Sequence, residues 1–248
     1  MQGLWTIYRR ELAGLFLSPL AWILLTIALF AHGYIFIFYL VSVTGRDLRA
    51  AMQLALAGDV FWWFMLLLPP LLTMRMISEE ARSGVLEFLL TAPATDVAVV
   101  LGKLAAATTF MGLLWSSVLL YGGAAHLLGV RPDWIPAISG VFGATLVSCL
   151  FSSIGLVASA LSSTPILAAF AAVVMNFLVI VLPSLDALLK LPAGHWAKVA
   201  LGHASVVSQY QSSFGIGVLD TKHLVFFAAW IAFFVFVATR LLEKRRWS

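Results

Sequence analysis

Long apolar stretches that recur along the whole chain constrain its fold more than any other feature. They cover residues 20–41, 61–76, 97–128, 134–161, 165–185 and 224–242. Peptide groups in hydrocarbon cannot bond to water, so an apolar stretch of about 17 to 25 residues satisfies its backbone by forming a helix. The stretches are continuous and lack the alternating pattern of membrane β-barrel strands. The sequence therefore predicts an all-α membrane protein with six transmembrane helices, the second of which is the shortest.

The amino-acid composition excludes a soluble globular fold. Of the 248 residues, 62% are hydrophobic and 10% are charged, whereas soluble domains carry about 25% charged residues. Because apolar stretches follow one another along the whole length, we expect residues 1–248 to form a single membrane domain. The formal net charge of +4 resides in Lys and Arg that flank these stretches. No separate basic domain is left that would bind nucleic acid.

Basic residues favour the cytoplasmic ends of membrane spans, and this rule gives the chain a direction. With six spans the two termini lie on the same side, and that side collects more Lys and Arg than the other. The residues concerned are Arg9, Arg10, Arg75, Arg82, Lys103, Arg240, Lys244, Arg245 and Arg246. We therefore expect a multi-pass protein of the bacterial inner membrane with both termini in the cytoplasm.

Two segments outside the spans have patterns of their own. In residues 1–18, apolar side chains recur at helical spacing beside polar ones, which predicts an interfacial helix on the cytoplasmic surface. Ser18 and Pro19 then form a corner, because proline disfavours helix in the residue before it and tolerates the start of a new helix. Residues 186–222 are too polar for a lipid-facing helix, so they predict an outer re-entrant or interfacial segment. The domain thus divides into residues 1–18, 20–185 with spans one to five, 186–222, and 224–242 with span six.

The stretch between the second and third spans combines charged residues with a short apolar run. Glu79, Glu80 and Arg82 would end the second helix, and Gly84 permits a break after it. Residues 85–90 can then form a short amphipathic helix across the membrane end. The alternative is a solvated loop whose charges pair locally and contribute little to stability.

This stretch closely resembles a known family motif. Residues 79–93 read EEARSGVLEFLLTAP, and the Leu-Gly-Lys of 101–103 follows; together they resemble the signature loop of the permeases of ABC exporters of the second type (ABC-2). Residues 10–12 (REL), 16–21 (FLSPLA) and 217–220 (GVLD) are similar to the gliding-motility branch of that class. Ala81 departs from the pattern, since the branch often has a basic residue there.

The resemblance implies a role for the loop. In such permeases it is the coupling helix, which docks into a cytosolic ATPase subunit. Apolar side chains would fill a groove on that partner, and charges would fix the orientation. The residues expected at this contact are Glu79, Glu80, Arg82, Gly84, Leu86, Glu87 and Phe88.

The same resemblance implies partners and excludes catalysis by this chain. No G-x-x-x-x-G-K-[ST] loop is present, so ATP and Mg belong to a separate ATPase. Six spans form half of the usual transport domain, so a second permease half, identical or not, is expected beside membrane lipids. The five histidines show no H-E-x-x-H spacing, so neither a metal nor another cofactor is expected here.

Two functions therefore stay open. The leading hypothesis is an exporter permease driven by the separate ATPase, with a hydrophobic or amphiphilic cargo favoured slightly over an ion or a peptide. The alternative is a non-transporting membrane scaffold that couples an ATPase to an envelope or gliding-motility assembly. An intramembrane enzyme is disfavoured, because the serines lie in small-residue stretches typical of helix packing.

Two polar residues lie deep within apolar stretches, His32 in the first span and Asn176 in the fifth. Such groups are functional candidates, and the alternative is a hydrogen bond between helices. That alternative is favoured for His32, and both interpretations stay open for Asn176. The aromatic run 61–64 indicates a belt at the membrane surface rather than a wall of the transport path. The candidates for a transport path are Asn176, Phe64 and Met175.

Overall fold

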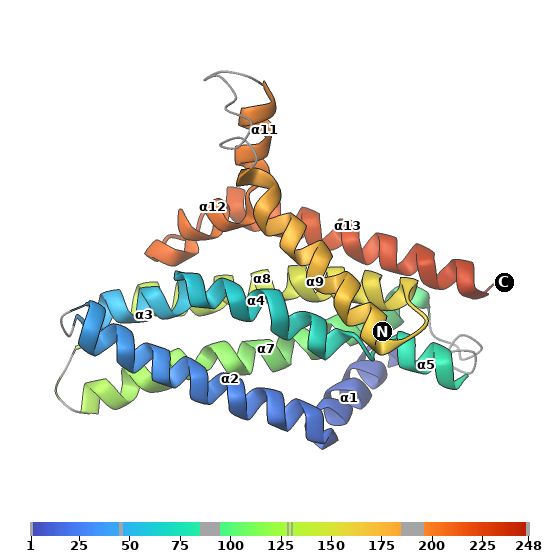
Figure 1. The fold of residues 1–248 in the computed structure, drawn as a ribbon, viewed down its shortest axis with the longest axis horizontal. Helices are drawn as coiled ribbons and strands as arrows, with labels where there is room; N and C mark the ends of the chain where they lie inside the picture. The colour runs from blue at the N-terminus through green and yellow to red at the C-terminus, as the bar shows by residue number, and fades with distance from the viewer. Residues whose placement is uncertain are drawn as a thin grey trace.

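The computed structural model describes residues 2–44, 47–84, 95–127, 129, 131–184 and 196–246. Their regular structure is helical, as the apolar stretches predict, and none of these residues lies in a strand (Figure 1). The helices are α1 (Gln2–Leu17), α2 (Pro19–Phe38), η1 (Tyr39–Val43), α3 (Leu48–Ala57), α4 (Asp59–Thr73), α5 (Ser78–Ser83), α7 (Asp96–Leu127), α8 (Trp134–Leu161), α9 (Pro165–Val181), η2 (Leu182–Ser184), α11 (Trp196–Ala204), α12 (Val206–Gln211), η3 (Phe214–Ile216) and α13 (Thr221–Arg246).

Five helical segments of the described chain are long and apolar enough to cross a membrane. They are Pro19–Val43, Leu48–Ser83, Asp96–Leu127, Trp134–Leu161 and Thr221–Lys244. The expected second span, residues 61–76, corresponds to α4, which has 15 residues, and with α3, α5 and the turns between them it makes up a segment of 36 residues. Only Gly58 separates α3 from α4. The polar residues of α3 interrupt the apolar pattern, so the sequence does not predict this helix as part of a span.

The expected fifth span is a short apolar helix. It ends at Val181 rather than at residue 185, which leaves α9 with 17 residues. At 1.5 Å per residue its length is about 26 Å, slightly less than the hydrocarbon thickness of a bilayer. After it, α11 has 9 residues and α12 has 6, so neither could cross a membrane.

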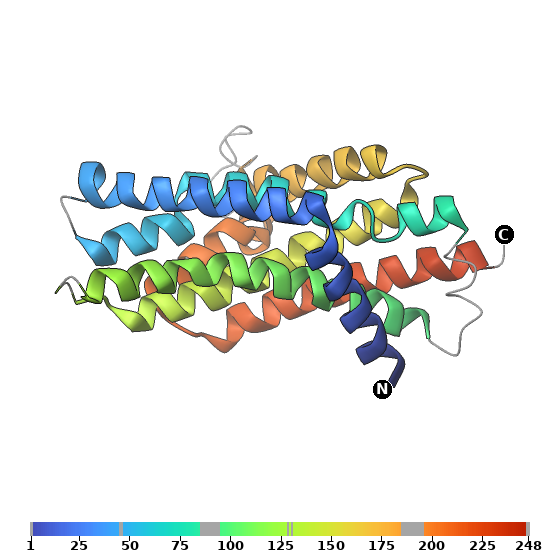
Figure 2. The same ribbon diagram turned by 90° about the horizontal axis from the view of Figure 1, so that it is seen from below.

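The helix α8 is the spine of the bundle, packed against α4, α7, α9 and α13 (Figures 1 and 2). Small residues allow this close packing, because glycine lets another helix approach the backbone directly. An added Cβ at Gly140 would lie 2.8 Å from Leu56, and one at Gly155 would collide with the hydroxyl of Thr73. The glycines of α8 thus hold α3 and α4 against it.

Aromatic side chains fix the short helix α12 to the bundle. The single proton of the Tyr210 hydroxyl is shared between the carbonyl oxygens of Leu56 (2.7 Å) and Gly140 (3.2 Å). Its ring stacks on Phe61 at a centroid distance of 5.2 Å and meets Trp62 edge-on. Both Phe61 and Trp62 are therefore buried, and for these two residues the expected surface belt is wrong.

One end of the bundle gathers segments that are far apart in the sequence. Figures 1 and 2 show α1, α5 and the end of α13 at this end, with the ends of η1 and α7 at the other. Here α1 crosses the bundle at an angle, because the chain bends at Ser18, whose backbone is extended (ψ 123°), and α2 begins at Pro19. The predicted corner is confirmed.

The contact between α4 and α8 can be tested at Gly155. A methyl group there would strike Thr73, whose hydroxyl already donates to the carbonyl of Pro69 at 2.8 Å. We expect Gly155→Ala to lower the free energy of unfolding by about 1–3 kcal/mol through overpacking, measured by thermal unfolding in detergent. The control is Gly123→Ala in α7, where an added Cβ meets nothing within 4 Å. Equal melting temperatures for the two variants would contradict this close packing.

Candidate functional site

A lysine in α7 is completely buried beside two carboxylates. Lys103 has a relative exposure of 0%, and its Nζ lies 2.9 Å from Oε1 of Glu11 and 2.8 Å from Oε2 of Glu80. Lysine is almost never fully buried unless its charge is paired. The two glutamates come from α1 and α5, so the ammonium group joins three helices.

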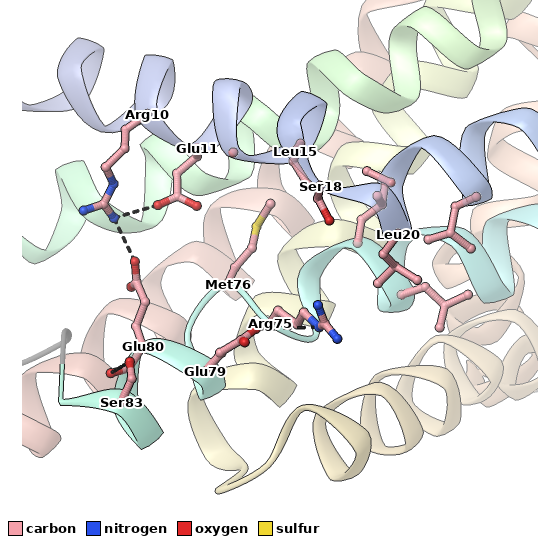
Figure 3. A pocket seen from close by; sticks show the side chains of 15 residues that line it. Arg10, Glu11, Leu15, Ser18, Leu20, Arg75, Met76, Glu79, Glu80 and Ser83 are labelled. Carbon is pink, nitrogen blue, oxygen red and sulfur yellow. Dashed lines mark hydrogen bonds and ion pairs between the residues drawn. The ribbon is translucent and has the colours of Figure 1, made fainter.

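A second cation completes the cluster. Nη2 of Arg10 lies 2.7 Å from Oε1 of Glu11 and 2.7 Å from Oε1 of Glu80 (Figure 3). Glu11 and Glu80 are therefore each shared by both cations, and the four formal charges sum to zero. We call Arg10, Glu11, Glu80 and Lys103 the charge network.

Close packing of α1 on α7 brings the charges together. An added Cβ at Gly102 would lie 2.8 Å from a methyl carbon of Ile7, so glycine is what allows α1 to approach this closely. Elsewhere along the same contact, the hydroxyls of Tyr8 in α1 and Thr109 in α7 are hydrogen-bonded at 3.2 Å. Glu11 thereby faces the first turns of α7, where Lys103 lies.

The network keeps Glu11 ionised. Burial alone raises the pKa of Glu11, but the charge of Lys103 and the hydrogen bonds from Arg10 and Lys103 outweigh it. The pKa of this carboxyl is consequently below its ordinary value of 4.5. At neutral pH Glu11 is therefore ionised.

A serine of α8 anchors the start of α5. The backbone N–H groups of Ile77 and Ser78 donate to Oγ of Ser159 at 3.2 and 3.0 Å, and this hydroxyl donates to the carbonyl of Met74 at 3.0 Å. These bonds satisfy the backbone where the chain leaves α4, which would otherwise be unpaired in the interior. At its other end α5 stops at Gly84, whose φ of 75° is left-handed, so the expected break is confirmed.

A pocket of about 420 Å³ lies beside the network, between α1, α2, α4 and α5 (Figure 3). One side carries charged groups, among them Arg10, Glu11 and Glu80, and the other side is apolar, with Leu20 and Leu72. Glu79 and Arg75 also line it and form a looser pair, with 3.6 Å between Oε2 and Nε. The pocket is therefore amphipathic.

The predicted contact residues have different positions. Glu80 lies in the network, Glu79 is exposed beside Arg75, and Arg82 is exposed near the end of α5. Leu86, Glu87 and Phe88, like the whole amphipathic run 85–90, lie outside the described residues. The sequence did not reveal the partners of Glu80, because Arg10 and Lys103 are 70 and 23 residues away.

The two polar candidates within the apolar helices, His32 and Asn176, are buried. Nε2 of His32 is 3.2 Å from the carbonyl oxygen of Ala55, so this nitrogen carries the proton, and Nδ1 accepts from the Ser117 hydroxyl at 3.3 Å. This is the expected interhelical bond. Asn176 has an exposure of 0% and so does not face lipid, and its amide bonds to none of the described residues.

The other two transport-path candidates lie near the core. Phe64 and Met175 are partly buried against it, and the ring of Phe64 lies 6.2 Å from that of His32. Among the described residues no three His, Cys, Asp or Glu side chains are grouped so that they could hold a metal ion.

The fold and the site define an all-helical chain with the apolar helices of a membrane protein and a buried charge network at one end of its bundle. Comparison with known proteins adds no narrower class: no family model matches the chain, and no curated protein matches its sequence.

Removal of the buried ammonium tests the network. Lys103→Met leaves Glu11 and Glu80 with a single cation, and breaking a buried ion pair by removing one partner costs about 3–5 kcal/mol. We expect a loss of about 3 kcal/mol, because Arg10 remains, measured by thermal unfolding in detergent. Adding Glu80→Gln should recover part of the loss, since it removes the surplus negative charge. The control Lys222→Met, at an exposed position, should leave the melting temperature unchanged. A wild-type melting temperature for Lys103→Met would refute the network.

The pH dependence of stability tests Glu11. Its pKa is lower in the folded than in the unfolded protein, so its ionised form stabilises the fold above the unfolded value and this contribution disappears as the pH falls through the folded value. We expect Glu11→Gln to be less stable than wild type at neutral pH, with a difference that shrinks steadily below pH 4.5. A difference that is constant from neutral to acid pH would contradict ionic stabilisation by Glu11.

Proposed function

We propose that this chain is the permease subunit of an ABC exporter of the second type, forming half of a translocation path that a separate cytosolic ATPase drives. The observation that carries the proposal is the attachment of α5 to three other helices through the charge network and Ser159. The helix α5 (Ser78–Ser83) forms the first part of the stretch 79–93, whose sequence resembles the coupling loop. A force applied there would reach the bundle through short polar contacts.

The distribution of charge supports a cytoplasmic position for this end of the bundle. Arg10, Arg75, Lys103, Arg240 and Lys244 all belong to segments that meet there. Basic residues near span ends favour the cytoplasmic side. In this orientation α1 lies along the inner membrane surface, and α9 is the fifth of six spans. The helices α11 and α12 then form the outer segment, of which α12 is re-entrant.

The geometry suggests how motion would pass through the subunit. A displacement of α5 pulls on Glu80, and Glu80 is tied to α7 through Lys103 and to α1 through Arg10. Electrostatic interactions are stronger at a buried site than in water, so such contacts resist separation. Ser159 carries the same displacement to the spine helix α8. Closure of the ATPase would thus move α1, α5, α7 and α8 together.

The outer surfaces of the bundle suit its expected neighbours. Of the 18 most apolar residues in a row within Pro19–Val43, only 17% are buried. The exposed side chains of α2 include Ile27 and Phe30. Lipid tails or the second permease half would cover such a surface. The chain would require both the ATPase and this second half for transport.

The proposal can be tested by charge reversal in the coupling loop. Glu87→Arg would replace attraction by repulsion at a complementary interface, so it should reduce copurification of the cognate ATPase and abolish its stimulation, while membrane insertion stays normal. The matched control is Glu243→Arg, an acidic residue of α13 at the same end of the bundle that pairs with Arg240. Wild-type recovery and wild-type ATP turnover with Glu87→Arg would remove Glu87 from the contact.

A transport assay separates the exporter from the scaffold. Vesicles that contain the chain, its second half and the ATPase should hydrolyse ATP faster when the exported compound is added. Copurification without any such stimulation across hydrophobic, amphiphilic and ionic compounds would favour the non-transporting scaffold.

A further inference from the structure

The amphipathic pocket joins two chemically different walls at the corner of the chain. Its apolar wall includes Leu20 and Leu24 of α2 and Leu71 of α4. Its charged wall comes from α1 and α5, where the apolar helices end. In a membrane this position is the boundary between acyl chains and headgroups. A molecule that fills the pocket must have a charged head and an apolar tail.

The charges on the wall are not equally available to such a molecule. Arg10, Glu11 and Glu80 already neutralise one another together with the buried Lys103. The pair of Arg75 and Glu79 is different, since its members are 3.6 Å apart and about half exposed (53% and 56%). Such a pair contributes little to stability, so each partner can exchange the other for a ligand.

The hydrogen-bonding groups of Arg75 and Glu79 that a ligand can use define the chemistry of its headgroup. Figure 3 shows the Arg75 guanidinium between Glu79 and the apolar wall, where it can bind a phosphate by two N–H donors. Glu79, one helical turn away, can accept hydrogen bonds from an ammonium group. A head with one phosphate and one ammonium leaves the neutral pocket neutral, whereas a purely anionic head would face the glutamates without compensation.

We propose that this pocket binds a phospholipid of the phosphatidylethanolamine class, with its phosphate on Arg75, its ammonium on Glu79 and the start of its acyl chains along Leu20, Leu24 and Leu71. Primary ammonium is preferred to the trimethylammonium of phosphatidylcholine, because only the former has N–H donors for a carboxylate. A volume of about 420 Å³ suits a headgroup with the first carbons of its chains. The proposal needs only a membrane around the bundle and is independent of the ATPase.

Competition between lipids tests the site in the isolated full chain. The protein, purified in detergent, is mixed with equal amounts of phosphatidylethanolamine, phosphatidylcholine and phosphatidylglycerol that carry identical acyl chains, and retained lipids are measured by native mass spectrometry. We expect wild type to retain one phosphatidylethanolamine about tenfold better than the other two, the effect of one charge-assisted hydrogen bond. Glu79→Gln should remove this preference, because Glu79 receives the ammonium group, whereas Arg75→Gln should lower retention of all three lipids, because each of them carries the phosphate. Leu71→Trp, which fills the apolar side, should lower retention of all three lipids.

The matched control is Arg240→Gln, because Arg240 also lies at this end of the bundle, lines a separate apolar groove and is paired with Glu243 at 2.6 Å. It should retain phosphatidylethanolamine as wild type does. Equal retention of phosphatidylcholine, or a preference for phosphatidylglycerol, would overturn the proposed headgroup. An equal loss in Arg75→Gln and Arg240→Gln would overturn the proposed site and indicate general attraction of lipid to basic side chains. Because no ATPase is present, these outcomes leave the proposed function untouched.

Discussion

The burial of one ammonium group governs the arrangement of this end of the bundle. Removing a charge from water is strongly unfavourable, and only closely placed opposite charges with good hydrogen bonds compensate for it. Lys103 therefore cannot be accommodated by α7 alone, since its partners belong to α1 and α5. Arg10 in turn prevents the two carboxylates from repelling each other. The three helices thus assemble as a unit or leave a buried charge unpaired.

The rest of the bundle depends on the small side chains of α8, which let other helices approach its backbone. Its glycines admit α3 and α4, and its Ser159 supplies the hydrogen bonds that the backbone lacks between α4 and α5. The same helix therefore provides both the close packing and the hydrogen-bond acceptor for the backbone between α4 and α5. This explains how the amides of Ile77 and Ser78 stay paired at a break in the interior, close to the charges that connect α5 to α1 and α7.

The sequence predicted those features that are encoded locally. Apolar length indicated helices, Ser18 and Pro19 indicated the corner, and Gly84 indicated a break. It could not predict pairings over long separations: nothing near Lys103 indicates that Glu11, 92 residues away, would bind it. The expected aromatic belt is wrong for Phe61 and Trp62 for the same reason, because belt and core use the same residue types and the packing of Tyr210 on these two rings could not be predicted.

The short length of α9 has a consequence for the surrounding bilayer. In the proposed topology this helix crosses the hydrocarbon, yet its 17 residues span about 26 Å where the core of a typical bilayer measures about 30 Å. Such hydrophobic mismatch costs a fraction of a kcal/mol per Å and is relieved by thinning of the lipid. In that topology the 3-10 turn η2 (Leu182–Ser184), which follows α9 directly, would have to supply the missing length at about 2.0 Å per residue, or the two leaflets would be drawn together there; in both cases membrane thickness would act on the helix that carries Asn176.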